Sequence, residues 1–159
     1  MTTETPSSKS STPTWKRWVF LSFRGEDTRT GFTDHLYHAL SQKAIDTFRD
    51  NEGLKRGEEI PPALWKGIEE SRYAIVVLSE KYASSTWCLR ELTKIAECKR
   101  VLGQTVIPIF YHVDKTDLIK PFAEHERNGK DNMEEVNKWR EALTEVANLP
   151  GWDLKDGYL

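Results

Sequence analysis

Tyr73-Ala74-Ile75-Val76-Val77-Leu78 is the stretch of sequence that decides the fold. No residue in it is charged, and consecutive positions are apolar, so both sides of a strand formed here would be buried. A strand buried on both faces belongs to a parallel sheet that is covered by helices. This stretch therefore predicts a β-strand inside an α/β fold.

The segments on either side of residues 73–78 have the spacing of helices. Upstream, Pro61 and Pro62 suit the first turn of a helix, where a missing N–H group does no harm. Downstream, residues 84–96 begin with three hydroxyl side chains that can cap a helix N-terminus, and apolar residues then recur at helical spacing. We therefore expect a helix before the strand and another after it.

The same alternation continues through the rest of the chain. Apolar runs predict further strands at residues 18–23, 44–49 and 106–111, and periodicity predicts helices at residues 32–40 and 134–148. Pro108 places the strand at 106–111 near a sheet edge, and residues 114–132 give no clear fifth strand. Repeated strand–helix units predict a parallel, doubly wound sheet with right-handed crossovers.

Length and composition limit the classes of protein. The 159 residues suit one domain, and a segment rich in Ser, Thr and Pro at residues 1–14 is expected to be a flexible lead-in to a domain at residues 15–159. The net charge of −2 argues against nucleic acid as the main partner. Cys88 and Cys98 are expected to be free thiols in a reducing cytosol. No apolar run is long enough to span a membrane, so we expect a soluble intracellular protein.

If the strand order is the flavodoxin-like 2-1-3-4-5, ligands should bind between the first and third strands, beyond their carboxyl ends. Two loops meet there, residues 24–29 and residues 79–87, and the second leads into the helix that carries Glu91. A guanidinium, a helix N-terminus and an indole favour a ligand with phosphates and an aromatic ring, such as a nucleotide. The sequence has no Walker A motif, no G-x-G-x-x-G and no G-x-S-x-G. His35 and His38 lack further ligands, so we predict no metal site.

Seven stretches resemble plant TIR (Toll/interleukin-1 receptor) domains in order and spacing. They are residues 19–29 (VFLSFRGEDTR), 32–36 (FTDHL), 47–50 (TFRD), 68–72 (IEESR), 82–92 (YASSTWCLREL), 108–111 (PIFY) and 139–143 (WREAL). The resemblance extends from Trp18 to Trp152 and implies a flavodoxin-like parallel sheet of order 2-1-3-4-5 with helices on both faces.

The resemblance also implies an activity, the hydrolysis of NAD⁺ or NADP⁺ at the bond between nicotinamide and ribose, as substrate and without a cofactor. Glu91 matches the family's catalytic glutamate. Nicotinamide leaves as a neutral molecule without a general acid, and a carboxylate would stabilise the oxocarbenium-like transition state. The substrate-binding residues implied by position are Phe23, Arg24, Gly25, Lys55, Arg56, Ser85 and Trp87.

The partners implied by the resemblance are other TIR domains and, in a longer parent protein, a C-terminal nucleotide-binding module. Self-association would use Asp34 and His35, where the family usually has Ser-His, and the last helix with Gly151. Such contacts need a patch that is complementary to itself. The expected location is the cytoplasm, with the nucleus left open.

The sequence departs from the family at residues 114–122, where the usual proline is missing and the segment is several residues shorter. This shortening predicts a weaker second interface and leaves open a non-catalytic adaptor that only docks other TIR domains. A nucleic-acid-dependent cyclic-nucleotide synthase is a third reading, which the charge of −2 does not support. Whether Leu159 is a natural end is also left open.

Overall fold

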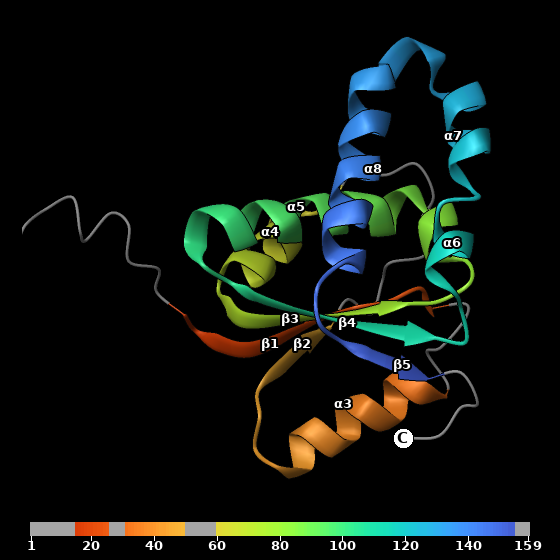
Figure 1. Cartoon of the computed structure of the whole chain (residues 1–159). Helices are drawn as coiled ribbons and strands as arrows, with labels where there is room; N and C mark the ends of the chain where they lie inside the picture. The colour runs from red at the N-terminus through yellow and green to blue at the C-terminus, as the bar shows by residue number, and fades with distance from the viewer. Residues whose placement is uncertain (1–14, 26–30, 50–59, 155–159) are drawn as a thin grey trace, which may run out of the picture.

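A computed structural model describes residues 15–25, 31–49 and 60–154. Its centre is a five-stranded sheet in the order β2-β1-β3-β4-β5, in which every neighbouring pair is parallel (Figure 1). The predicted strand order 2-1-3-4-5 is therefore confirmed. The strands are β1 (Arg17–Ser22), β2 (Thr47–Arg49), β3 (Ser71–Leu78), β4 (Thr105–Tyr111) and β5 (Trp152–Leu154).

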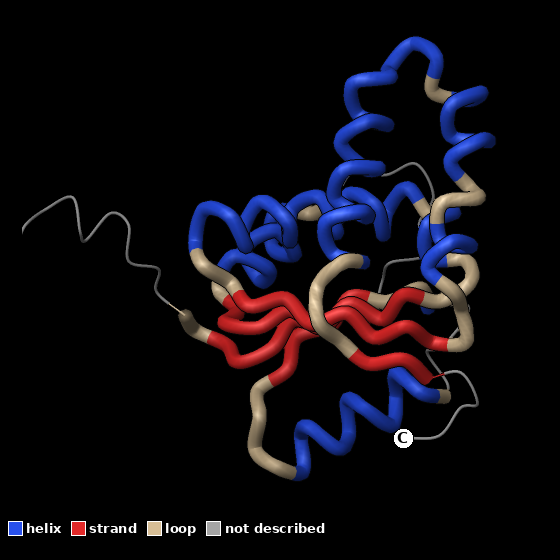
Figure 2. The backbone as a smooth tube through the Cα atoms, viewed as in Figure 1, coloured by secondary structure: helices blue, strands red, loops and turns tan. Residues whose placement is uncertain are grey.

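Helices cover both faces of this sheet, as predicted (Figure 2). On one face lie α4 (Pro62–Glu69), α5 (Thr86–Leu102) and α8 (Met133–Ala147), and α3 (Phe32–Gln42) lies on the other (Figure 1). The larger hydrophobic cluster joins Phe20, Val76 and Leu78 to the first group of helices. A smaller one joins Val77 to Phe32 at the start of α3. Residues 73–78 thus contribute to both cores, as expected for a central parallel strand.

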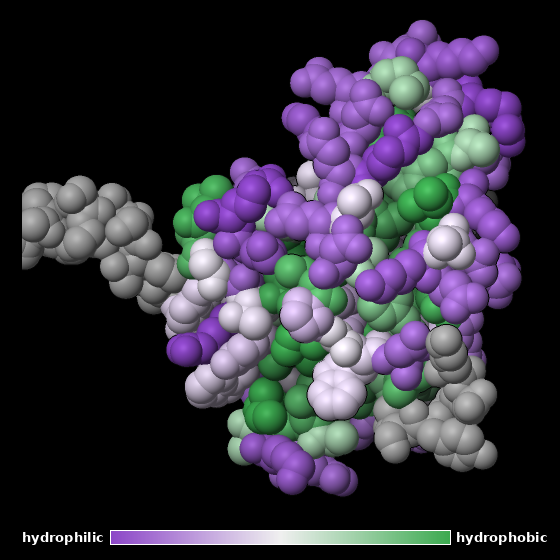
Figure 3. All heavy atoms as spheres, in the orientation of Figure 1, coloured by the Kyte–Doolittle hydropathy of each residue, from purple (hydrophilic) through white to green (hydrophobic). Residues whose placement is uncertain are grey.

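The segment between β4 and α8 forms two short helices, α6 (Lys115–Leu118) and α7 (Phe122–Asn128), and a 3₁₀ turn, η2 (Lys130–Asn132). The His125 ring lies 5.4 Å from the Trp139 ring and therefore joins α7 to α8. Helices α7 and α8 extend away from the sheet, and hydrophilic side chains cover most of their outer surface in this view (Figures 1 and 3). The shortened segment at residues 114–122 is thus folded into helices.

Of the five strands, β5 is the one that the sequence did not predict. It has only three residues, one of them Asp153, and Trp152 is 67% exposed, so it has no apolar run. Its partner is the second half of β4, from Ile109 to Tyr111. In the sheet, β4 is second from the edge, which agrees with the prediction that the strand containing Pro108 lies near an edge. Pro108 itself lies just before the pairing with β5 begins.

Gly151 brings the chain close enough to pair with β4. A Cβ atom at this position would collide with the carbonyl oxygen of Pro108, a backbone atom that cannot move aside. Gly151 therefore has a packing role, whatever its role in self-association.

The second strand begins at Thr47, three residues later than predicted, because Ala44 has a φ of 60° and cannot belong to a strand. Among the described helices, none combines the length and apolar character needed to cross a membrane.

Candidate functional site

The site is built around the first two turns of α5. Ser85 has an extended backbone, and its Oγ accepts a hydrogen bond from the backbone N–H of Cys88 at 3.1 Å. This is an N-cap, and it starts the helix at Thr86. Trp87 and Glu91 then lie one turn apart on the buried side of the helix.

The Glu91 carboxylate is buried and receives hydrogen bonds on both oxygens. Its side chain is 3% exposed. The Ser22 hydroxyl donates to Oε1 at 2.8 Å, and the Trp87 indole N–H donates to Oε2 at 3.0 Å. A buried carboxylate without partners would be strongly destabilising, so these donors are what allow an acid to remain here.

A second layer of polar groups lies behind Ser22. The Tyr82 hydroxyl lies 2.8 Å from Ser22 Oγ and 3.3 Å from the Cys88 carbonyl oxygen. Tyr82 belongs to the 3₁₀ turn η1 (Tyr82–Ser84) and is completely buried. Burial raises the pKa of Tyr82 well above its ordinary value, so its hydroxyl keeps its proton at neutral pH. The group is therefore a chain of neutral donors that ends on one acceptor, Glu91.

These residues lie at the carboxyl ends of two adjacent strands. Ser22 is the last residue of β1, and η1 and α5 follow β3. Since β1 and β3 are neighbours in the order 2-1-3-4-5, this is the switch point where open α/β sheets bind ligands. These side chains thus gather at the edge of the sheet where we expected a ligand to bind.

Several predicted site residues are brought together here. Phe23 follows β1 and is 8% exposed, and its carbonyl accepts a hydrogen bond from the Cys88 thiol at 3.6 Å. Arg24 and Gly25 come next and are half-buried. Lys55 and Arg56 lie outside the described residues.

Trp87 and Ser85 are placed differently from the roles expected of them. We expected Trp87 to offer a stacking plane, but its side chain is 8% exposed and its N–H is bound to Glu91. We expected Ser85 to offer a hydroxyl to substrate, but its Oγ caps α5. Ser22 and Tyr82 were not assigned any role from the sequence, although both lie within the stretches that carry the family resemblance.

The predicted self-association residues lie elsewhere. Asp34 and His35 are on α3, on the opposite face of the sheet. Asp34 pairs with Arg49 and with His38, both at 3.5 Å, and His35 is exposed.

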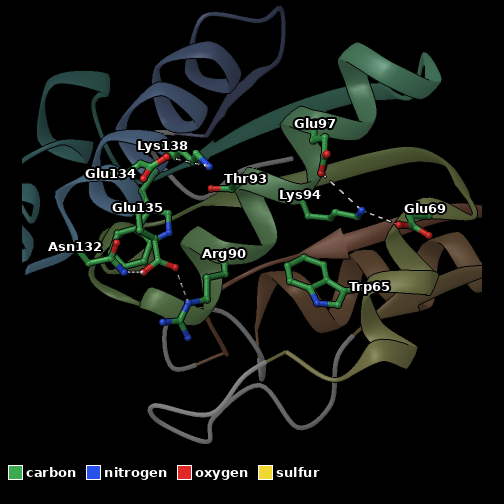
Figure 4. Close-up of a pocket in the computed structure, with 11 residues that line it drawn as sticks. Trp65, Glu69, Arg90, Thr93, Lys94, Glu97, Asn132, Glu134, Glu135 and Lys138 are labelled. Carbon is green, nitrogen blue, oxygen red and sulfur yellow. Dashed lines mark hydrogen bonds and ion pairs between the residues drawn. The ribbon is translucent and has the colours of Figure 1, made fainter. Parts of the chain in front are cut away.

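A separate cavity of about 650 Å³ lies on the outer side of α5, between α4 and α8 (Figure 4). The Trp65 indole and several charged side chains line it. Its three cations are paired within the cavity: Lys94 with Glu69 at 2.6 Å, Arg90 with Glu135 at 3.3 Å and Lys138 with Glu134 at 4.0 Å. A charged ligand would have to break these ion pairs, so this cavity is a weaker candidate than the Glu91 site. Within residues 15–25, 31–49 and 60–154, no three His, Cys, Asp or Glu side chains gather as a metal site would require.

Comparison with known proteins finds a matching family model and similar plant proteins. A family model described as "TIR domain" matches residues 17–158. The chain is 55% identical over 161 residues to the disease resistance protein RPV1 of Vitis rotundifolia, covering 94% of the chain and 11% of that protein. It is 55% identical over 151 residues to the TMV resistance protein N of Nicotiana glutinosa, covering 91% of the chain and 13% of that protein. The chain thus spans only a small part of these relatives.

Among solved structures, the TIR domains of the activated Roq1 resistosome, which directly recognizes the pathogen effector XopQ, match with a TM-score of 0.79 and 49% identity over 90% of each chain.

Proposed function

The chain belongs to the TIR domain family, in the form carried by plant disease resistance proteins, and we propose that it signals in immunity by hydrolysing NAD⁺ or NADP⁺ when copies associate. The observation that carries this proposal is the buried Glu91 carboxylate at the switch point between β1 and β3, held by donors on both oxygens. A buried acid in such a position is typical of a functional site.

The chemistry requires little more than one fixed carboxylate. The bond between ribose C1′ and the nicotinamide nitrogen breaks, and both of its electrons leave with nicotinamide, which becomes neutral. The positive charge that develops on the ribose is stabilised by the negative charge of Glu91. Water then adds to C1′ and loses a proton, so the products are ADP-ribose (or its 2′-phosphate), nicotinamide and a proton.

Access to Glu91 requires a change at Trp87. The carboxylate is 3% exposed, and the indole N–H occupies Oε2. If Trp87 moves outward, it frees this oxygen and exposes a ring that can stack on the substrate. We therefore place Trp87 at the entrance to the site, and we assign Phe23, Arg24, Gly25, Lys55 and Arg56 to substrate binding.

Self-association is proposed because the solved relative contains TIR domains within an assembled resistosome. The contacts proposed for this chain are Asp34 and His35 on α3, with α8 and Gly151 as the second surface. The chain matches only 11% and 13% of the two curated relatives, so a nucleotide-binding module further along a longer protein is part of the proposal. The proposed location is the cytoplasm.

A second candidate function is that of an adaptor which docks other TIR domains without catalysis. The covering of Glu91 favours this alternative, because a carboxylate with both oxygens bound within the chain is not available to a substrate.

The deciding experiment measures nicotinamide release from NAD⁺ at increasing protein concentration. We expect release to rise faster than linearly with protein, and to fall to background in Glu91→Gln, which keeps the size of the side chain. Glu97→Gln is the matched control, because it makes the same change at an exposed glutamate of the same helix, α5. Release that is absent from the wild-type chain under crowding would leave the adaptor as the function.

A further inference from the structure

The Glu91 carboxylate is held differently on its two sides. On Oε2 the donor is Trp87, a side chain that must move if substrate is to enter. On Oε1 the donor is Ser22, which lies in β1 and is completely buried. Of these two contacts, the one with Ser22 is the one that can persist while substrate is bound.

The hydrogen bonds on the Ser22 side have a fixed direction. A serine hydroxyl has one proton, and Ser22 gives it to Glu91, because an ionised carboxylate can only accept. The Tyr82 hydroxyl must then be the donor across the 2.8 Å contact to Ser22, and its 3.3 Å contact to the Cys88 carbonyl is the weaker of the two. Hydrogen bonds in such a series strengthen one another in a buried environment.

We propose that Ser22 and Tyr82 are positioning residues that hold Glu91 in one orientation, with Oε1 anchored and Oε2 facing the ribose. This inference rests on the proposed hydrolysis. The terminal torsion of a glutamate is broad, so a carboxylate held on one oxygen by a rigid strand is better oriented than one held by a mobile indole alone. Tyr82 acts only through Ser22, and neither residue touches substrate.

Kinetics of variants of the full chain test this. Ser22→Ala removes a donor to a charged acceptor, and we expect kcat to fall about 10- to 100-fold. Tyr82→Phe keeps the ring and removes the hydroxyl, and we expect a fall of about 3- to 10-fold. The KM for NAD⁺ should change less than about twofold, because the lost orientation affects the transition state more than substrate binding.

The double variant is the sharpest test of the series. If Tyr82 acts through Ser22, then Tyr82→Phe has no further effect on kcat once Ser22→Ala is present. Effects that multiply, or a rise in KM with kcat unchanged, would overturn the proposal. Ser22→Thr keeps the hydroxyl and should restore most of kcat, which a role in packing alone would not predict.

A matched control separates positioning from stability. Ser71 is also a completely buried strand serine, but its hydroxyl donates to the Gly67 carbonyl at 2.8 Å and not to Glu91. Ser71→Ala should lower the melting temperature as Ser22→Ala does and leave kcat unchanged. An equal loss of kcat in both variants would show that the hydroxyls matter only for folding.

A measurement without activity keeps this inference distinct from the proposed hydrolysis. The NMR ¹⁵N–¹H signal of the Trp87 indole, assigned by its loss in Trp87→Phe, reports on Oε2 of Glu91, the oxygen that Ser22 does not contact. We expect it to move in Ser22→Ala, to move less in Tyr82→Phe, and to stay in place in Ser71→Ala. If the wild-type chain releases no nicotinamide, the proposed hydrolysis fails, while an indole signal unmoved in all variants defeats the positioning role itself.

Discussion

Ser85→Ala removes the N-cap of α5, the helix that carries Trp87 and Glu91. The Cys88 N–H, which now donates to Ser85 Oγ at 3.1 Å, would be left without this partner in a region where Ser85 is only 7% exposed. Loss of such a cap costs about 1 to 2 kcal/mol of unfolding free energy. For a domain of this size, each kcal/mol lowers the melting temperature by about 2 to 4 °C.

Urea denaturation of Ser85→Ala, with Ser84→Ala beside it, measures this effect. Ser84 is the exposed neighbour in η1 and does not cap the helix, so its variant should differ little from wild type. Amide exchange at Cys88 should also accelerate in Ser85→Ala, because its N–H loses the acceptor. Equal unfolding free energies for the two variants, with unchanged exchange at Cys88, would refute the capping role of Ser85.

Three further predictions concern the rest of the fold. Gly151→Ala should cost about 1 to 3 kcal/mol by forcing a Cβ into the Pro108 carbonyl, and a circular dichroism melt checks it; an unchanged melt would mean that β5 tolerates a side chain there. Burial raises the pKa of Tyr82, so above about pH 10 the folded state keeps a proton that the unfolded state loses. The free energy of unfolding should therefore fall as pH rises above about 10, and it should fall less in Tyr82→Phe; urea titrations at several pH values measure this. Burial raises the pKa of Cys98 to about 11, so its thiol should resist iodoacetamide at pH 8 until urea unfolds the chain, and rapid native labelling at Cys98 in peptide mass spectra would contradict this.

The central strand β3 was predictable because its apolar residues can be buried on both faces only in a parallel sheet covered by helices. Residues 73–78 are apolar on both faces, and in the fold Val76 packs on one side of the sheet and Val77 on the other. The edge strand β5 could not be found in this way, because Trp152 is exposed and Asp153 is polar. Its strand conformation comes from pairing with β4, which is a tertiary contact that local sequence does not encode.

The candidate site was predictable in its position and only partly in its contacts. The alternation of strands and helices indicated the edge of the sheet, and the family resemblance indicated Glu91. The contacts of Ser22 with Glu91 and with Tyr82 span 69 and 60 positions of sequence, and they depend on the pairing of β1 with β3. A buried serine in an otherwise apolar strand was the available signal, because it needs a hydrogen-bonding partner.

The parallel sheet also fixes where the backbone enters and leaves. The chain enters β1 at the amino-terminal rim, and it leaves β5 at the opposite rim, where the Leu154 carbonyl accepts a hydrogen bond from the His112 N–H beyond the end of β4. Ser22 and Glu91 lie at that same rim. In a longer protein, the chain would therefore set out toward any following module from the same rim of the sheet that carries Glu91.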